Sequence, residues 1–196
     1  MRPFDQPLLV ATARAHYDQP HRAYHDAGHL DELLLLAATH TPDLDDAEQL
    51  ALLFHDAVYV PGAGPGENER LSARLMEATL HALADRLPQW TADTVAKAAR
   101  IVEATTHAAP PPDEAARVCD LDLWRLAAPW AEFQRHAEGI WREYGHLRGS
   151  RAAFVAARLA FYRMMLDKPA LFATPYFRGR FEAAARANMR RALDAG

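Results

Sequence analysis

The chain has 196 residues, half of them hydrophobic, so it is long enough to bury a sizeable core in one globular domain. Its formal net charge of −4 argues against binding to a nucleic acid polymer, which needs a broad basic surface to displace counterions. A small charged ligand is compatible with this charge.

The cysteine count and the N-terminal sequence indicate the cellular compartment of the protein. Cys119 is the only cysteine, so neither an internal disulfide nor a thiolate zinc cluster can form within the chain. The first 22 residues lack the apolar region of a signal peptide, and no segment approaches the roughly 18 apolar residues of a membrane span. We therefore expect a cytoplasmic protein with no membrane partner.

Helices are expected almost throughout, because Ala, Leu, Arg and Glu dominate and apolar positions recur at spacings of three and four. Prolines and glycines mark the breaks between them. In chain order, the expected helices cover residues 3–17, 22–39, 44–61, 67–87, 92–106, 113–126, 129–147, 151–167 and 176–194. The pattern predicts an all-α fold with a single helical domain over residues 1–196.

The first group of chemically interesting residues is HDAGH, at positions 25–29. His25 and His29 are four apart, so on a helix they would lie on one face and could share a metal ion. Alternatively, they are half-buried polar residues bonded to neighbouring groups. The string also resembles the HExxH helix of zinc proteases, but Asp26 stands where the general-base glutamate should be.

The second group is His55-Asp56, which directly follows the apolar run LALLF. Two ionisable groups in this position are expensive to bury without a partner such as a metal ion. Neighbouring helical residues point about 100° apart, so both can reach one ion only at the edge or end of a helix. The alternative is a surface histidine beside a solvated acid.

The third group is VCDLDLW, in which Asp120 and Asp122 stand in an apolar helical run. Carboxylates in such a run are rarely buried unpaired. Because residues two apart on a helix project in different directions, only one of them can readily bind the same ion. The other would orient a ligand histidine or cap a neighbouring helix.

Taken together, these groups give the order His, then His-Asp, then Asp, which resembles the HD superfamily of metal-dependent phosphohydrolases. The likeness extends to one bacterial branch of predicted HD-type hydrolases and covers nearly the whole chain. The blocks that carry it are YDQPHRAYHDAGHLDELL, LLFHDAVYVP, ENERLSA, IVEATTHA, CDLDLWRL, IWREY and FEAAARANM. Two departures bear on packing and substrate: Ala57-Val58-Tyr59 follows the HD pair without the usual glycine, and DLDLWRLAAP carries Ala where glycine is common.

The resemblance implies an HD-domain-like helical bundle, a divalent metal held by His29, His55, Asp56 and Asp122, and hydrolysis of phosphate esters or anhydrides. Asp122 rather than Asp120 matches the position of the family's last ligand. Mn, Mg, Fe, Ni, Co and Zn all suit a mixed imidazole and carboxylate set.

Catalytic roles are predicted for two residues. Asp56 would bind the metal and orient the attacking water. His107, in ATTHAAPP, would give a proton to the leaving group or contact a second metal ion. The alternative for His107 is a helix C-terminal histidine that interacts favourably with the helix dipole.

Further residues are candidates for contacts with the substrate or with the ligands. Asn68, Glu69 and Ser72 stand at the start of a helix close to the HD pair in the resembling block, although acids there also complement the helix dipole. Cations that could hold a phosphate are Arg22, Arg70, Lys168 and Arg186, each of which could equally be a surface charge.

The sequence thus predicts an enzyme that hydrolyses a small phosphorylated molecule, with a nucleotide as the first substrate to test. Two other classes remain open. One is a catalytically idle HD module that binds a nucleotide or metal as a sensor, and the other is a metal hydrolase or oxygenase that uses the same ligands for different chemistry. The oligomeric state is not predicted.

Overall fold

The computed structural model describes residues 2–195, in which all regular structure is helical and no strand is present. The all-α prediction is therefore confirmed. The α-helices are α1 (Pro7–Ala15), α2 (Ala27–His40), α3 (Asp46–Phe54), α4 (Glu67–Ala82), α5 (Ala92–Ala104), α6 (Ala116–Leu123), α7 (Trp130–Tyr144), α8 (Arg151–Asp167) and α9 (Pro175–Ala195). Short 3-10 helices are η1 (Pro3–Asp5), η2 (Asp113–Ala115), η3 (Trp124–Ala127) and η4 (Gly145–Leu147).

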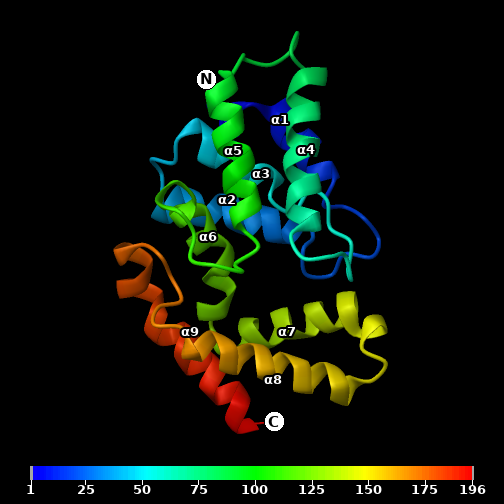
Figure 1. The fold of residues 1–196 in the computed structure, drawn as a ribbon, viewed down its shortest axis with the longest axis vertical. Coiled ribbons are helices and arrows are strands. Elements are labelled where there is room, and N and C mark those ends of the chain that lie inside the picture. The colour runs from blue at the N-terminus through cyan, green and yellow to red at the C-terminus, as the bar shows by residue number, and fades with distance from the viewer. Residues whose placement is uncertain (1, 196) are drawn as a thin grey trace.

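The helices form an upper and a lower part, joined through α6 and η3 (Figure 1). In the upper part α4 and α5 lie side by side and α3 packs against both of them. In the lower part α7 and α8 pack through two aromatic pairs, Phe133 with Tyr162 and Trp141 with Phe154. Helix α9 packs on α8 and on η3. Segments far apart in the chain are thus brought together where the two parts meet.

Side-chain caps fix where the helices that carry the conspicuous residues begin. The carboxylate of Asp26 accepts the N–H of His29, so α2 starts at Ala27 and His29 lies in its first turn. Asp45 and Glu48 form a reciprocal capping box at the start of α3. Residues 47–54 of α3 are all buried, which makes it the central helix of the upper part.

Several helices are shorter than the sequence predicted. The predicted helix 22–39 begins only at Ala27, and the one predicted to reach residue 61 ends at Phe54. The guanidinium of buried Arg22 explains both differences, because it donates to the backbone carbonyls of His25, Asp56 and Ala57 and holds both segments in turns. The segment predicted as helix 113–126 starts and finishes as 3-10 helix, and the segments 3–17 and 129–147 each contain a 3-10 turn at one end.

No helix in residues 2–195 is both long and apolar enough to cross a membrane.

Gly139 allows α7 to approach the segment before α2, and this contact gives a testable prediction. A Cβ at Gly139 would lie 2.6 Å from the backbone carbonyl of Ala23, whereas a Cβ at Gly179 in α9 would meet nothing within 4 Å. We expect Gly139→Ala to lower the free energy of unfolding by about 1–3 kcal/mol, since backbone must move. The matched control Gly179→Ala should be neutral or stabilising by up to about 1 kcal/mol, because alanine favours helix.

Urea unfolding of the two variants measures the difference. Equal stability of the two alanine variants would contradict the close packing of α7 on this segment.

Candidate metal centre

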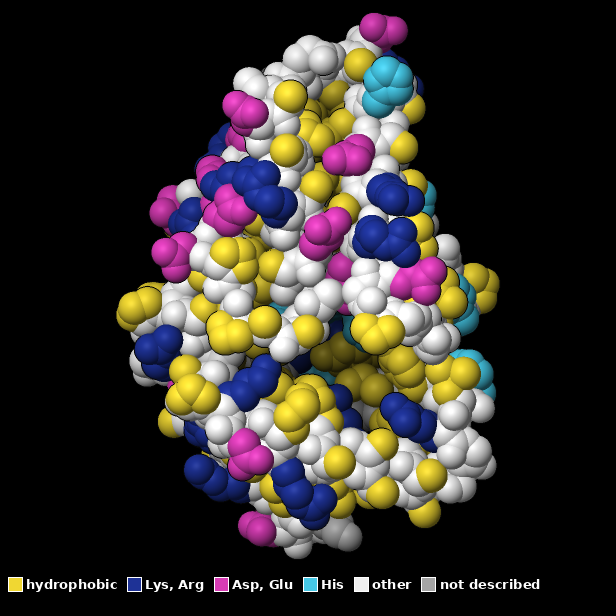
Figure 2. Space-filling view, viewed as in Figure 1, with side chains coloured by type: hydrophobic (Ala, Val, Ile, Leu, Met, Phe, Trp, Pro, Cys, Tyr) yellow, Lys and Arg dark blue, Asp and Glu magenta, His cyan; other side chains and the backbone are white. Residues whose placement is uncertain are grey.

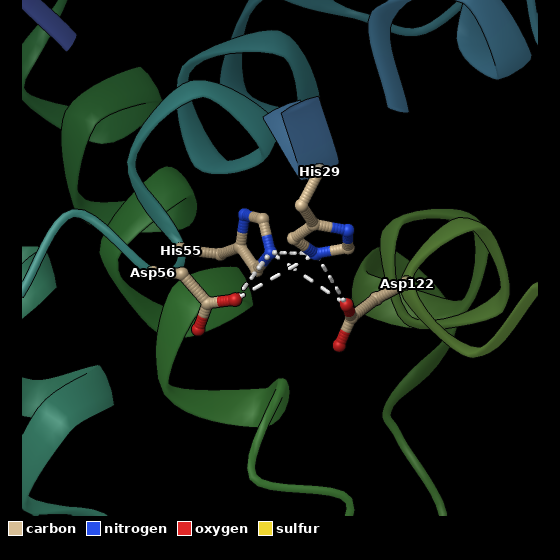
Figure 3. A group of neighbouring side chains, drawn as sticks. All are labelled: His29, His55, Asp56 and Asp122. Atoms are coloured by element: carbon tan, nitrogen blue, oxygen red, sulfur yellow. Dashed lines mark hydrogen bonds and ion pairs between the residues drawn. The ribbon is translucent and has the colours of Figure 1, made fainter. Parts of the chain in front are cut away.

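Four side chains from three parts of the chain converge on one point (Figure 3). His29 comes from the first turn of α2, His55 and Asp56 directly follow α3, and Asp122 lies near the end of α6. One ligand atom from each lies within 4.8 Å of all the others. The set is the one that the sequence resemblance implied.

The separations suit a single ion. His29 Nε2 lies 3.2 Å from Asp122 Oδ1 and 3.4 Å from His55 Nε2, and His55 Nε2 lies 3.1 Å from Asp56 Oδ2. Two further distances are slightly longer, at 3.7 Å from His29 Nε2 to Asp56 Oδ2 and 3.6 Å from His55 Nε2 to Asp122 Oδ1. Ligand atoms about 2.1 Å from a tetrahedral ion stand roughly 3.4 Å apart, so the cluster has the size that an ion requires.

The orientation of the His55 ring also favours metal binding. Its Nδ1 lies 3.0 Å from the backbone carbonyl of Leu52, which can only accept a hydrogen bond, so Nδ1 carries the proton. Nε2 then faces the cluster and would coordinate a metal ion through its lone pair when the ion displaces any proton from it. His29 likewise presents Nε2, while its buried Nδ1 has no partner in the part of the chain that the structure describes.

The charges in the cluster call for a cation. Burial opposes ionisation of Asp56, but the neighbouring His55 lowers the pKa of this carboxyl to about 2. Burial likewise opposes ionisation of Asp122, yet hydrogen bonds from His107 and His29 hold its pKa well below the usual range. Burial lowers the pKa of His29 to about 4. Burial also opposes protonation of His55, but its interactions with Asp56, Tyr17 and Asp122 together raise the pKa of this ring. Without an ion, the site near neutral pH therefore holds two carboxylates, a neutral His29 and a protonated His55, and a bound cation would take the place of the His55 proton.

His107 holds Asp122 from outside the cluster. Its Nε2 lies 2.7 Å from Asp122 Oδ2, while Oδ1 of the same carboxylate faces His29. The backbone of His107 has a φ of 53°, a conformation that residues other than glycine rarely adopt. Tertiary contacts therefore maintain it. The structure thus places His107 against a ligand and outside the group of ligand atoms.

Asp120 does not face the cluster. Its carboxylate accepts the N–H groups of Ala173 and Thr174 at 2.6 and 2.8 Å and the Thr174 hydroxyl at 2.6 Å, just before α9 begins. The hypothesis that it accepts a hydrogen bond from a ligand histidine is wrong. The alternative, that it caps a neighbouring helix, holds only indirectly, because the hydroxyl of Thr174 accepts the first-turn N–H of Phe177 while Asp120 holds Thr174 in place. The helical spacing explains why only Asp122 reaches the cluster.

His25 also lies elsewhere than predicted. It precedes α2, so it does not share a helical face with His29, and the idea of an ion bound between this pair is wrong. Its Nδ1 lies 2.6 Å from Oε1 of Glu143, and its ring stacks on Tyr59 with centroids 3.7 Å apart. The other oxygen of Glu143 accepts the N–H groups of residues 23–25. Glu143 was missed in the sequence because it stands 118 residues away.

The remaining predicted contacts are mainly with backbone. Asn68 pairs with both backbone groups of Val60, and buried Ser72 does the same with Val58, so the two hold the segment that follows the HD pair. Glu69 is half-buried in the first turn of α4. Lys168 Nζ lies 3.4 Å from the His107 carbonyl.

The other predicted cations, like Lys168, contact groups of the protein itself. Arg22 holds the turn carbonyls described above, Arg70 approaches Glu67 at 3.9 Å, and Arg186 pairs with Glu182 at 2.6 Å.

A cavity of about 330 Å³ adjoins the cluster, and Asp122, His107 and His25 are part of its wall. Figure 2 shows the molecule hollowed where the upper and lower parts meet, with hydrophobic side chains inside and Lys or Arg side chains beside the opening. The cations of this cavity are Arg125, Arg148 and Arg158. Sequence reasoning missed them, since nothing near them in the chain distinguishes them from other surface arginines.

No protein-family model, no curated protein and no solved structure matches this chain. The link to the HD superfamily therefore remains a resemblance carried by sequence blocks.

Glu143 gives a prediction about pH. Burial opposes its ionisation, but the hydrogen bond with His25 and those from backbone N–H groups lower its pKa from 4.5 to about 2. A carboxyl whose pKa is lowered by folding stabilises the protein fully above pH 4.5, and this contribution disappears as pH falls toward 2. We expect Glu143→Gln to lower the free energy of unfolding at pH 7 by about 2–3 kcal/mol.

The difference between Glu143→Gln and wild type should shrink steadily below pH 4.5 in urea unfolding measured at a series of pH values. A difference that stays constant down to the lowest pH at which both proteins fold would contradict the ionised, hydrogen-bonded state of Glu143.

Substitutions of Asp122 and Asp120 provide a matched test of metal binding. We expect Asp122→Asn to weaken manganese binding at least about tenfold, because a neutral amide loses the charge that attracts a divalent ion. Asp120→Asn should leave manganese affinity nearly unchanged and lower the free energy of unfolding by about 1–3 kcal/mol, because an amide nitrogen would face the N–H donors before α9.

Equilibrium dialysis and urea unfolding measure the two effects. The reverse outcome, with Asp120→Asn losing the metal and Asp122→Asn keeping it, would show that the aspartates exchange roles.

Proposed function

We propose that this chain is a metal-dependent phosphohydrolase of the HD type that acts on a small phosphorylated molecule. The observation that carries the proposal is the convergence of His29, His55, Asp56 and Asp122 within 4.8 Å. The same residues, in the same order, form the ligand set implied by the sequence resemblance. The fold and the sequence resemblance thus point to the same set of side chains.

The four ligands would hold one divalent ion, for which Mn, Mg, Fe, Ni, Co and Zn are all suitable. When bound, such an ion lowers the pKa of a water molecule and offsets negative charge on a phosphate. The chain's own residues supply the rest. Asp56 directs Oδ2 toward His55, so its second oxygen is available to orient a water molecule for attack.

We propose that His107 donates a proton to the leaving group. Its Nε2 is engaged with Asp122, so a proton for the departing oxygen would come from Nδ1. The residue lines the cavity, which puts it on the side from which a substrate approaches. Its contact with Asp122 also fixes the direction of that ligand.

The proposed substrate is a small molecule and not a nucleic acid polymer. The cavity of about 330 Å³ lies at the small end of ligand-binding cavities, and the net charge of −4 does not favour a polyanion. The cytoplasm is the proposed setting. There the single cysteine would stay reduced, and burial raises the pKa of the Cys119 thiol to about 12.

The test combines metal content with hydrolysis. We expect the manganese-loaded protein to hold about one ion per chain and to hydrolyse at least one member of a panel of phosphate esters. His55→Ala and Asp56→Ala should abolish this hydrolysis while helical content, measured by circular dichroism, stays near wild type. Two exposed residues supply matched controls, His81→Ala and Asp85→Ala, which should keep full activity.

Full activity of either HD-pair variant would show that the pair is structural. A wild-type protein that binds no divalent ion after reconstitution would contradict the proposal as a whole.

A further inference from the structure

We propose that the cavity beside the metal centre selects phosphate esters whose organic part carries a second anionic group, bound by Arg148 and Arg158. This inference rests on the proposed function, because it takes the scissile phosphate to lie at the cluster that contains Asp122. It adds a substrate class and two specificity-determining residues.

The charges that line the cavity are unbalanced. Within residues 2–195, Asp122 is the only carboxylate that lines the cavity, and it belongs to the metal cluster. Three arginines line the same cavity, namely Arg125, Arg148 and Arg158. Much of the remaining wall is aromatic or aliphatic, so no other charged side chain of the wall balances the arginines.

Arg125 is already neutralised within the protein. Its Nε lies 2.6 Å from Oε2 of Glu32, and its Nη1 donates to the backbone carbonyl of Tyr24 at 2.8 Å. The guanidinium also stacks over the Tyr24 ring at 4.6 Å. Arg125 is therefore a fixed part of the wall and has no need of an external anion.

Arg158 is held in place by aromatic rings and not by an acid. Its guanidinium carbon lies 4.8 Å from the ring centroids of both Phe161 and Tyr162, and its Nε donates to the Tyr162 hydroxyl at 3.0 Å. No carboxylate within residues 2–195 lies at ion-pair distance from it. The two terminal nitrogens remain available on a preorganised side chain.

Arg148 completes the pair from a different element. It follows η4, is exposed at the edge of the cavity, and forms no ion pair with a carboxylate of the described chain. Two guanidinium groups without acidic partners, beside walls of low polarity, create a positive potential that an anion would relieve. Guanidinium groups bind carboxylate or phosphate through paired N–H donors.

The apolar side chains of the cavity would contact the part of the substrate that lies between its two anionic groups. Leu123, Ile140 and Phe154 line the cavity with Tyr24 and Phe161, which suits a ring or a short hydrocarbon group. A ligand of this class would place one anion at the cluster and the other at the arginines.

The experiment uses two pairs of non-hydrolysable probes that differ only in charge. These are 3- and 4-carboxybenzylphosphonate and the corresponding neutral carbamoylbenzylphosphonates, titrated into manganese-loaded protein by calorimetry. We expect at least one carboxylate to bind about tenfold more tightly than its amide. Arg148→Gln and Arg158→Gln should each reduce this preference to threefold or less. Arg163→Gln, an exposed arginine of the same helix α8, should retain it.

Equal dissociation constants for acid and amide in both isomers would overturn the inference, as would a preference that survives both cavity variants. The proposed function is tested separately by hydrolysis. An active enzyme without charge preference contradicts this inference alone, whereas a preserved charge preference in a protein that hydrolyses no phosphate ester contradicts the proposed function alone.

Discussion

Two imidazoles, each less than 4 Å from the carboxylates of Asp56 and of the partly buried Asp122, form the constraint on which this structure depends. The two carboxylates offer oxygens within 4.8 Å of each other, and their repulsion is costly unless a cation lies between them. The chain gathers these groups from α2, the end of α3 and α6, so the packing of the upper part is what brings them together. A site with this composition is hard to explain as a simple structural network.

The support around the cluster is made of buried polar contacts to backbone. Arg22 holds the carbonyls of Asp56 and Ala57, and the hydroxyl of Tyr17 donates to the carbonyl of Leu53 and accepts the N–H of Asp56. Glu143 fixes the segment that leads into α2 by accepting three backbone N–H groups. The contacts of Arg22 and Tyr17 fix the backbone at Asp56, and the contacts of Glu143 fix the segment before α2, so together they help to orient the ligand side chains.

Helical periodicity and the chemistry of isolated motifs could predict much of this arrangement. The positions of most helices follow from apolar spacing and from prolines, and the four ligands follow from ionisable groups inside apolar runs together with a family resemblance. Spacing alone left Asp120 and Asp122 open, since each stands in the same apolar run. The structure separates them because Asp122 faces His29 while Asp120 binds the segment just before α9.

What could not be predicted depends on contacts between distant segments. The helix before His29 is absent because Arg22 and Glu143 bind the backbone there, and neither interaction leaves a local signal in the sequence. The arginines of the cavity are similar, because what separates Arg148 and Arg158 from other arginines without an acidic partner, such as Arg163, is that they line the same hollow. Local helix propensity determines which segments are helical. Tertiary hydrogen bonds determine at which residue a helix ends and which groups its side chains contact.

The most direct test of the metal centre is anomalous diffraction from crystals of the manganese-loaded protein. The account predicts one strong manganese peak per chain, located among the imidazole Nε2 atoms of His29 and His55 and the carboxylates of Asp56 and Asp122. Ligand atoms should lie about 2.0–2.3 Å from that peak. A peak bound by other residues, or no peak in crystals soaked at millimolar manganese, would contradict the account.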